Sequence, residues 1–437
     1  MVALSRSLLL LICLEVRRDF SNLFLCSSET LLTMTFDEKF RDMADSLATL
    51  AVRGGGGGSE ASAQPYGAVV APVFHTTTFE FATFDEMRRY ARGELPESFF
   101  YSRYANPTVA EVERKIALLE GAEAALVTSS GSAATFSALA ALCEAGDEII
   151  TTDSIYGGTT RILTEVMKRF GISVRFIAID DVPHLANFVS ERTRVLWFET
   201  PTNPINRLVD LDEAARAARA AKLFSIVDNT FATPILQRPL AHGTNATMHS
   251  ATKYLGGHSD LTAGAITGSA DYIKRVRHMS VMTGATLDPA AAYLLARGIK
   301  TLDVRVKAIC ANALQVARSL RAHKKVKRVY YPGLEDDPNH ELARRQMRGF
   351  GGVVAIDIDG GEQEVERFFD ALKLVHNAPS LGGVETLASY PLYSSHSGFT
   401  SEQLRAAGVS ASTVRFAIGI EAATDIIADI HQALDKI

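Results

Sequence analysis

The sequence contains few cysteines and has no net positive charge. The four cysteines, Cys13, Cys26, Cys143 and Cys310, are spread over 437 residues and form no Cys-x-x-Cys pair. Such a set argues against a disulfide scaffold and a zinc site, and predicts a reducing, cytoplasmic setting. The formal net charge of -5 argues against a nucleic-acid partner, because phosphate backbones select basic surfaces.

Long hydrophobic runs are missing as well. The apolar run SLLLLICL, from Ser7 to Leu14, is too short to span a bilayer, and no other stretch is a transmembrane candidate. No A-x-A-like cleavage site follows this run. We expect residues 1–45 to be an N-terminal extension, which is disordered, serves as a targeting presequence, or lies upstream of a start at Met34.

The length of the chain predicts two domains, because one hydrophobic core rarely serves so many residues. TFDEKFRDMADSLATLAV, at residues 35–52, has helical character. The glycine run Gly54 to Gly58 then predicts a flexible connector, and it lacks the lysine that a P-loop requires. GAVVAPVFHTTTFEF, at residues 67–81, is rich in β-branched residues and predicts extended structure.

From about Ala122 onward, predicted strands and helices alternate. The strands are AALVT, DEIITT, SVRFIAI, RVLWFET and LFSIVD, and helices such as SAATFSALAALCEAG and GGTTRILTEVMKRFG end at a glycine. Strands that are apolar throughout predict a parallel sheet with helices on both faces. Its site is expected after the carboxyl ends of the strands, which is where these polar residues fall: Ser130, Gly131, Tyr156, Asn203 and Asp228.

A long helical stretch, residues 288–323, leads away from this sheet. The remainder predicts a smaller α/β unit with the strands VKRVYY, GGVVAIDI and STVRFAIG, a helix from Glu362 and a closing helix. We expect a large domain at residues 106–300 and a small C-terminal domain at residues 301–437.

Taken alone, each polar feature also has an ordinary structural explanation. SSGSAAT after a strand is either an anion site at a helix N-terminus or a simple helix cap. Asp228 in IVDNTF ends an apolar strand, where it has a functional partner or caps the next turn. The ordinary explanation for Tyr156 is packing in the hydrophobic core. Arg415, inside a predicted strand, pairs with an internal carboxylate or with a ligand.

The combination is more specific than its parts. Lys253 follows two small hydroxyl residues, Ser250 and Thr252, and precedes a glycine pair. Pyridoxal phosphate (PLP) requires a lysine for a Schiff base with its aldehyde and an acid for its ring nitrogen. It also requires an aromatic ring for stacking and donors for its phosphate. The sequence offers one residue or motif of each kind.

The order of the motifs YSRYANPT, YGGT, ETPTNP, VDNTF, SATKYLGGHSD and SLGGVETL resembles that in the Cys/Met-metabolism PLP enzymes. That family includes cystathionine γ-lyase, cystathionine γ-synthase, cystathionine β-lyase and methionine γ-lyase. The resemblance runs from about residue 46 to the C-terminus, and the lysine motif is its most specific part. It implies the fold type I, aspartate-aminotransferase-like architecture and a homotetramer built from two tight dimers.

The resemblance also implies roles for individual residues. Lys253 matches the Schiff-base lysine and Asp228 the partner of the pyridinium nitrogen, while Tyr156 matches the stacking ring and a second acid/base. The remaining matches are the phosphate ligands Ser250, Thr252, Gly131 and Ser132, the ring-hydroxyl neighbour Asn203, and the substrate-binding Arg415 and Ser380. Tyr101 and Arg103, in the segment 46–105, match a pair that reaches the phosphate of the neighbouring subunit. No metal ion is implied.

Substrate choice rests on two positions. Methionine γ-lyases typically have a cysteine two places after the stacking tyrosine, whereas this chain has Gly158, which favours the cystathionine branch. Many cystathionine-cleaving members have a glutamate before SLGG, where this chain has Pro379. Despite the missing glutamate, we expect γ-elimination of cystathionine. One alternative is γ-replacement on an activated homoserine, as in a cystathionine γ-synthase or an O-acetylhomoserine sulfhydrylase. The other alternative is the methionine γ-lyase reaction.

Two alternatives come from other classes of protein. A transaminase on the same fold would keep Lys253 and Arg415 but would need neither YGGT nor the segment with Tyr101 and Arg103. A binding-only relative would have no reason to retain the lysine, aspartate, tyrosine and arginine together.

Overall fold

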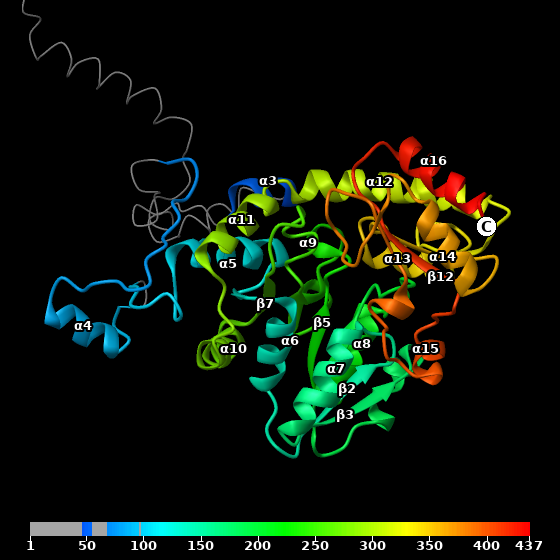
Figure 1. The fold of residues 1–437 in the computed structure, drawn as a ribbon. Helices are drawn as coiled ribbons and strands as arrows, with labels where there is room; N and C mark the ends of the chain where they lie inside the picture. The colour runs from blue at the N-terminus through cyan, green and yellow to red at the C-terminus, as the bar shows by residue number, and fades with distance from the viewer. Residues whose placement is uncertain (1–45, 55–67, 96–97) are drawn as a thin grey trace, which may run out of the picture.

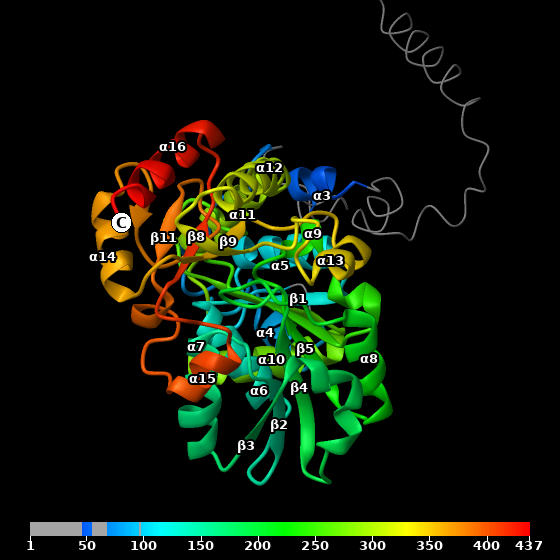
Figure 2. The ribbon, with the colours of Figure 1, turned by 90° about the vertical axis from the view of Figure 1, so that its right-hand side faces the viewer.

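The structure is a computed structural model, and it describes residues 46–54, 68–95 and 98–437. The predicted presequence and the glycine run beyond Gly54 lie outside these residues. Two sheets organise the described chain (Figures 1 and 2). No helix in these three ranges is long and apolar enough to cross a membrane.

The larger sheet has the strand order β1-β7-β6-β5-β4-β2-β3. Its strands are β1 (Ala124–Thr128), β2 (Glu148–Thr152), β3 (Ser173–Ile177), β4 (Thr193–Glu199), β5 (Phe224–Asp228), β6 (Ala246–His249) and β7 (Gly264–Gly268). The sheet is mostly parallel, as expected, and the exception is β7, which is antiparallel to both β1 and β6. No crossover helix separates β6 from β7, so the chain turns back beside the strand it has just left.

The apolar strands are explained by helices on both faces of the larger sheet. In β4, Val195 and Trp197 pack into a cluster on one face, while Leu196 and Phe198 pack into a cluster on the other. The first cluster includes residues of α6 (Gly131–Ala140), of the π-helical turn η2 (Ile162–Met167), which continues α7 (Gly157–Arg161), and of α10 (Ala270–Thr283). The second includes α8 (Leu211–Ala220) and the 3-10 helix η3 (Ile179–Asn187).

Two helix ends differ from the sequence prediction. Helix α6 ends at Ala140, well before Gly146, because the chain turns at residues 141–142. The N–H groups of Leu142 and Cys143 both donate to the Leu139 carbonyl, which ends the regular helical pattern. The predicted stretch from residue 288 is two helices, α11 (Pro289–Ile299) and α12 (Leu302–Arg321). Thr301 separates them with non-helical backbone angles of φ -105 and ψ 7.

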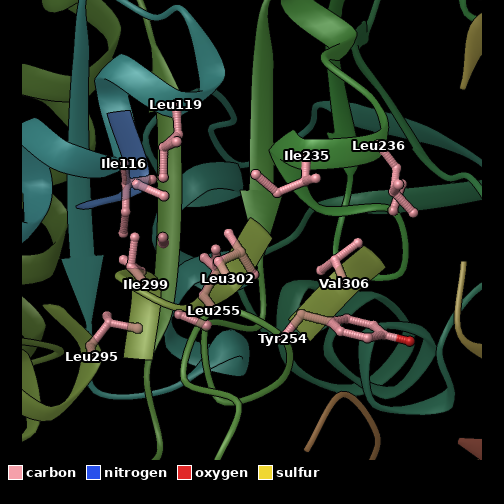
Figure 3. Packing of buried hydrophobic residues seen from close by; sticks show 14 of the residues in the cluster. Ile116, Leu119, Ile235, Leu236, Tyr254, Leu255, Leu295, Ile299, Leu302 and Val306 are labelled. Carbon is pink, nitrogen blue, oxygen red and sulfur yellow. The ribbon is translucent and has the colours of Figure 1, made fainter. Parts of the chain in front are cut away.

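Helices α11 and α12 pack with α3 (Leu47–Arg53), α5 (Pro107–Glu120) and α9 (Thr233–Leu236) around one apolar cluster. Figure 3 shows Ile116, Leu255, Ile299 and Leu302 lying together in this cluster. Leu255 directly follows the segment that carries Lys253, so the same core supports both the helices and the lysine loop.

The smaller sheet has the order β10-β11-β12-β9-β8. Its strands are β8 (Val326–Tyr330), β9 (Val353–Ile358), β10 (His376–Asn377), β11 (Leu387–Ser389) and β12 (Thr413–Ala417). Helices α14 (Glu362–Ala371) and α16 (Ala423–Leu434) pack with α12 against it, as Figure 1 shows beside the C-terminus. Short elements complete this region: α13 (His340–Gln346), η5 (Pro391–Tyr393) and α15 (Ser401–Ala406). The α/β fold class is confirmed, and the domain boundary near residue 300 stays a prediction.

Residues 68–95 and 98–105 lie apart from both sheets, with α4 (Phe84–Ala91) at the edge of the molecule in Figure 1. The predicted strand at residues 67–81 does not form within the described part, where a single bridge pairs Thr78 with Tyr101. Helix α4 has no buried residues. With little to pack against within its own chain, this segment stays extended rather than joining a sheet.

Candidate active site

A cavity of about 440 Å³ opens at the carboxyl ends of the large-sheet strands and is closed by residues from the second half of the chain. Its lining includes Ser130, Gly131, Ser132, Tyr156, Glu199, Asn203, Asp228, Ser250, Thr252, Lys253, Pro379, Ser380, Ser394, Ser395 and Arg415. The structure thus brings together every predicted site residue except Tyr101 and Arg103.

An anion cradle lies where α6 begins. Ser130 caps the helix by accepting a hydrogen bond from the Ala133 N–H, at 3.1 Å. A Cβ atom added to Gly131 would lie 3.0 Å from both Cβ and Oγ of Ser250, so glycine lets the start of α6 approach Ser250 without displacing it. Free N–H groups at the start of a helix, with a hydroxyl beside them, suit a phosphate.

Thr252, in contrast, already has two backbone partners. Its hydroxyl donates to the Ala263 carbonyl at 3.1 Å and accepts from the Ala263 N–H at 2.9 Å. These bonds join the two ends of the loop between β6 and β7. The predicted role of Thr252 as a phosphate ligand stays a prediction.

Asp228 ends β5 and is buried. Its Oδ1 atom accepts from the Thr230 N–H at 3.0 Å and from the Thr230 hydroxyl at 2.5 Å. Burial raises the pKa of Asp228, whereas the bonds from Thr230 and the charge of His249 lower it. The carboxylate therefore acts as a cap, as one sequence explanation held, and also faces the cavity.

Lys253 pairs with a hydroxyl instead of a carboxylate. Its Nζ donates to Ser380 Oγ at 2.7 Å. Burial, followed by the charge of Arg415, lowers the pKa of Lys253 to about 8. A lysine with such a pKa is a neutral nucleophile far more often than a solvent-exposed lysine is.

Arg415 lies in β12 and reaches across to the large sheet. It donates to Asn203 Oδ1 at 2.9 Å and to the Ser380 carbonyl at 2.8 Å. Its Nε is buried without a hydrogen-bond partner among the described residues, and burial lowers its pKa to about 10. The question left open by the sequence has a partial answer: the hydrogen bonds of Arg415 go to neutral groups, and the nearby Glu199 carboxylate interacts with it electrostatically.

Sequence reasoning missed Glu199, which ends β4 as Asp228 ends the neighbouring β5. Its two oxygens accept from the Tyr156 N–H at 2.9 Å and from the Asn203 N–H at 2.6 Å. Burial, with the nearby charge of Asp228, raises the pKa of Glu199 well above its usual value. The signal was present in the sequence, because an acid that ends an apolar strand was the argument used for Asp228.

Tyr156 and the Tyr101/Arg103 pair differ in placement. The Tyr156 side chain lines the cavity and is 46% exposed, so it is not a core residue. Arg103 lies over the rings of Tyr101 and Tyr104, at 5.7 and 4.9 Å, and donates to the Val281 carbonyl at 3.1 Å. Neither Tyr101 nor Arg103 lines the cavity of its own chain, and their role in a neighbouring subunit stays a prediction.

Among residues 46–54, 68–95 and 98–437, no group of histidine, cysteine, aspartate and glutamate side chains is arranged to hold a metal ion.

Comparison with known proteins gives a consistent result. Residues 48–435 match the family model described as "Cys/Met metabolism PLP-dependent enzyme". An L-methionine gamma-lyase of Fusobacterium nucleatum subsp. polymorphum is 40% identical over 376 residues, which cover 85% of this chain and 95% of the relative. The chloroplastic cystathionine gamma-synthase 1 of Arabidopsis thaliana is 41% identical over 371 residues, which cover 85% and 66%.

A solved structure agrees with these sequence relatives. The cystathionine gamma synthase of Xanthomonas oryzae pv. oryzae, in complex with aminoacrylate and cysteine, superposes with a TM-score of 0.84 at 34% identity. The match covers 90% of this chain and 98% of that chain.

Proposed function

Because the chain belongs to the Cys/Met-metabolism PLP-dependent enzymes, we propose that it catalyses γ-elimination from a sulfur amino acid. Pyridoxal phosphate is the cofactor of this family. The proposed reaction converts cystathionine and water into cysteine, 2-oxobutanoate and ammonia. The observation that supports it most strongly is the placement of Lys253, whose pKa is about 8, against Ser380 in the cavity that also holds Arg415.

The residues of the cavity fit PLP. Ser250, Gly131 and the first N–H groups of α6 form a cradle that a side chain at position 131 would fill. The buried carboxylate of Asp228 suits a protonated ring nitrogen. Lys253, in the same cavity, carries the amine that binds the aldehyde.

When bound, PLP supplies an electron sink for negative charge that develops on the substrate carbon atoms. Lys253 is the proposed base for the substrate Cα proton, and it would deliver and remove further protons from the same side. Its lowered pKa keeps a useful fraction of its amine neutral near physiological pH.

Arg415 is the proposed binder of the substrate carboxylate. Its two hydrogen bonds, to Asn203 and Ser380, fix the guanidinium plane and leave the buried Nε without a partner among the described residues. A carboxylate in the cavity would provide the missing acceptor and the missing negative charge. Ser380 links this site to the lysine, because its carbonyl binds Arg415 and its hydroxyl binds Lys253.

Tyr156 is the proposed stacking ring and second acid/base. A tyrosine hydroxyl acts as a base more readily when positive charge lies nearby. We propose that the cofactor site and Arg103 of a neighbouring copy supply this charge.

Methionine is the second candidate substrate, and one feature of the cavity favours it. The carboxylates that line the cavity, among the described residues, are Glu199 and Asp228. Both are engaged by the N–H bonds described above, and Pro379 stands where many cystathionine-cleaving relatives have glutamate. The second ammonium group of cystathionine thus has no obvious partner in its own chain, whereas methionine needs none.

The test is incubation of the purified PLP-loaded protein with cystathionine, methionine, or an O-acyl homoserine plus cysteine. Release of 2-oxobutanoate from cystathionine would support the first proposal, and release of 2-oxobutanoate with methanethiol from methionine the second. A new thioether with no oxo acid would contradict both and identify γ-replacement, for which the cystathionine γ-synthase relatives are a precedent.

We also propose that the chain forms a homotetramer, a dimer of dimers, in the cytoplasm, where the free Cys143 and Cys310 stay reduced. Arg103 is exposed in its own chain, which supports a role for it in the neighbouring site. If so, mixing Arg103→Ala with Lys253→Ala should restore about a quarter of wild-type activity, because half of the random dimers carry one intact site of two. No recovery in confirmed mixed dimers would contradict shared sites.

A further inference from the structure

Glu199 has no role in the mechanism above, although it lines the same cavity. It is the last residue of β4 and is 3% exposed. In the register of the large sheet it pairs with Asp228, the last residue of β5. Two acids thus lie side by side where two neighbouring strands end. Burying an acid is costly unless its oxygens are bound, so the partners of Glu199 are informative.

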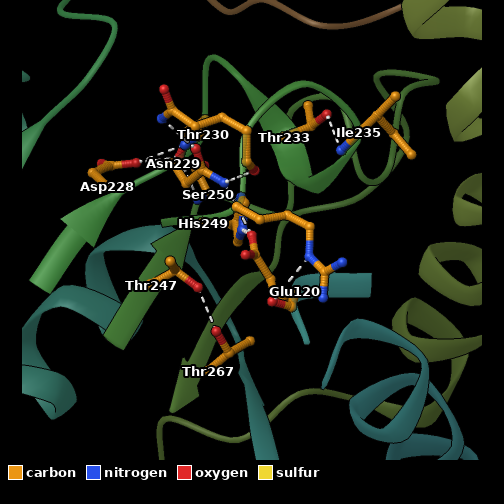
Figure 4. A network of polar contacts seen from close by, with 12 residues as sticks. Glu120, Asp228, Asn229, Thr230, Thr233, Ile235, Thr247, His249, Ser250 and Thr267 are labelled. Carbon is orange, nitrogen blue, oxygen red and sulfur yellow. Dashed lines mark hydrogen bonds and ion pairs between the residues drawn. The ribbon is translucent and has the colours of Figure 1, made fainter. Parts of the chain in front are cut away.

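The two acids bind different kinds of partner. Asp228 accepts from the N–H and the hydroxyl of Thr230, only two residues further along the chain, as Figure 4 shows. Glu199 instead bridges two segments, because it accepts from the Tyr156 N–H at 2.9 Å and from the Asn203 N–H at 2.6 Å. Tyr156 follows β2 and Asn203 follows β4. Asp228 therefore caps one turn, whereas Glu199 joins the loops that follow two different strands.

The direction of both bonds is fixed, because each proton is carried by a backbone nitrogen. Glu199 is the acceptor at both ends, whether or not its carboxyl group is ionised. The two bonds use different oxygens, Oε2 for Tyr156 and Oε1 for Asn203. A side chain with a single acceptor oxygen could therefore keep only one of the two bonds.

On one side, this bridge leads to the substrate-binding arginine. Asn203 is 3% exposed, and its side-chain Oδ1 accepts from Arg415 at 2.9 Å. Arg415 also donates to the carbonyl of Ser380, and the hydroxyl of Ser380 accepts from Lys253. Glu199 thus holds the backbone of the same asparagine whose side chain holds the guanidinium group.

On the other side, the bridge leads to the ring that is proposed to stack on PLP. Tyr156 directly precedes α7, and its side chain is 46% exposed, so packing alone does not fix it. Its N–H is bound by Glu199. A Cβ atom added to the next residue, Gly157, would lie 2.0 Å from the Ser395 carbonyl oxygen. The start of α7 is therefore held between the end of β4 and the loop that carries Ser395.

We propose that Glu199 is a positioning residue that sets the stacking ring of Tyr156 and the carboxylate-binding Arg415 relative to each other. It acts through two backbone N–H groups and needs no contact of its own with the cofactor or the substrate. The inference rests on the proposed roles of Tyr156 and Arg415, and it is independent of which sulfur amino acid is the substrate. It assigns a function to a buried acid at a strand end that neither caps its own turn nor binds a cation directly.

The experiment measures how the PLP-loaded protein binds two amines, L-norleucine and pentylamine, which differ only in the carboxylate. Neither has a leaving group on its γ-carbon, and the absorbance change of bound PLP reports the binding. The wild type should bind norleucine about 100-fold more tightly, because only norleucine has a carboxylate for Arg415. Glu199→Gln should reduce this ratio about tenfold, because one N–H loses its acceptor and the support of Asn203 is weakened. Its affinity for pentylamine should stay within about twofold of the wild-type value.

A second readout follows Tyr156. The visible circular dichroism of bound PLP depends on the chiral surroundings of its ring, which include the stacking residue. Glu199→Gln should therefore change the intensity of this signal, while the amount of PLP bound per chain stays the same. A role in stability alone would not alter the signal of the folded, loaded protein.

Asp429 provides a matched control. It lies in α16, outside the cavity, and is 6% exposed. Its two oxygens accept from the N–H groups of Lys373 and Leu374, at 3.0 and 2.8 Å. Asp429→Asn alters the same kind of buried acceptor and should keep both the wild-type ratio and the wild-type spectrum. Thermal melting identifies any variant that fails to fold.

A wild-type ratio or a wild-type spectrum in folded, PLP-loaded Glu199→Gln would overturn the proposal, and so would equal changes in Asp429→Asn. If Glu199→Gln does not fold, Glu199→Asp decides by the same two readouts, because its side chain is one methylene shorter and cannot keep both bonds at these lengths. A wild type that binds both amines equally would contradict the proposed role of Arg415, and this inference with it, before any variant is made. Failure of the proposed γ-elimination is distinct from these outcomes, because neither amine can undergo it.

Discussion

The cavity has two walls of different construction. The sheet wall consists of Glu199, Asp228, Ser250 and Lys253, which lie at or just beyond the ends of β4, β5 and β6. The loop wall consists of Pro379, Ser380, Ser394 and Ser395, which lie in connections beside the smaller sheet. The carboxylates of the sheet wall are fixed by backbone N–H groups. In the loop wall, Ser380 takes a strained backbone with φ 105, and Ser394 and Ser395 follow the short helix η5.

This difference separates two kinds of specificity. The sheet wall offers fixed charges and a glycine cradle, which suit one particular cofactor. The loop wall offers hydroxyls and a proline, which can change without disturbing the strands. We therefore propose that the sheet wall selects the cofactor and that the loop wall contributes to the choice of substrate.

The largest loss of activity is expected on removal of the Lys253 side chain from the sheet wall. Lys253→Ala should lower kcat by at least about 1000-fold, because both the covalent attachment and the proposed base disappear. Turnover with a loaded enzyme is the measurement. Lys274→Ala, which removes an exposed lysine from α10, is the control and should behave as wild type. A Lys253→Ala enzyme with more than a few per cent of normal activity would contradict the assigned role.

A second change in the sheet wall should have a somewhat smaller effect. Asp228→Ala should lower kcat roughly 100-fold to 1000-fold, because the ring nitrogen loses the charge that keeps it protonated. The protein should remain folded, although Thr230 loses its acceptor. Steady-state kinetics and a thermal melt test this, and near-normal turnover with bound PLP would mean that Asp228 is only a cap for the next turn.

The two walls also differ in how well the sequence predicts them. Asp228 and Lys253 were found because an acid at the end of an apolar strand and a lysine among small hydroxyls are local patterns. The same pattern occurs at Glu199, inside ETPTNP, but the asparagine is the residue that the family resemblance singles out there. The antiparallel strand β7 was also missed, since GAITG is short and nothing in its composition reveals its direction.

The loop wall has no comparable local signal. Ser394 and Ser395 line the cavity only because the smaller sheet folds back over the larger one. The role of Arg415 is implied by the family resemblance, but its partners Asn203 and Ser380 are distant in the chain. Contacts of this kind depend on tertiary packing, which composition and periodicity do not encode.

The rate at which the apoprotein captures PLP should depend on pH through the buried amine of Lys253. Because burial lowers the pKa of Lys253 to about 8, the apoprotein amine becomes neutral as the pH rises through 8. The rate of PLP capture should therefore rise about tenfold per pH unit up to pH 8 and then level off. Stopped-flow absorbance measures this rate, with a free lysine derivative as the control. A rate that keeps rising to about pH 10 would show an ordinary, exposed lysine.

The mildest change concerns the loop wall. Pro379→Glu should raise kcat/KM for cystathionine relative to methionine by about tenfold, the value of one moderate charge pair with the second ammonium group. PLP affinity should not change, because Pro379 is not part of the sheet wall. Equal effects on the two substrates would show that position 379 does not face the distal group and would weaken the division between the walls.

Lys253 is proposed to carry the cofactor, and covalent trapping of the cofactor on the protein identifies the residue that holds it. Purified PLP-loaded protein should absorb visible light, lose that absorbance on treatment with borohydride, and retain the cofactor after denaturation. Peptide mapping should then find the reduced pyridoxyl group on Lys253. A label on any other lysine, or no label in protein shown to contain PLP, would contradict the account.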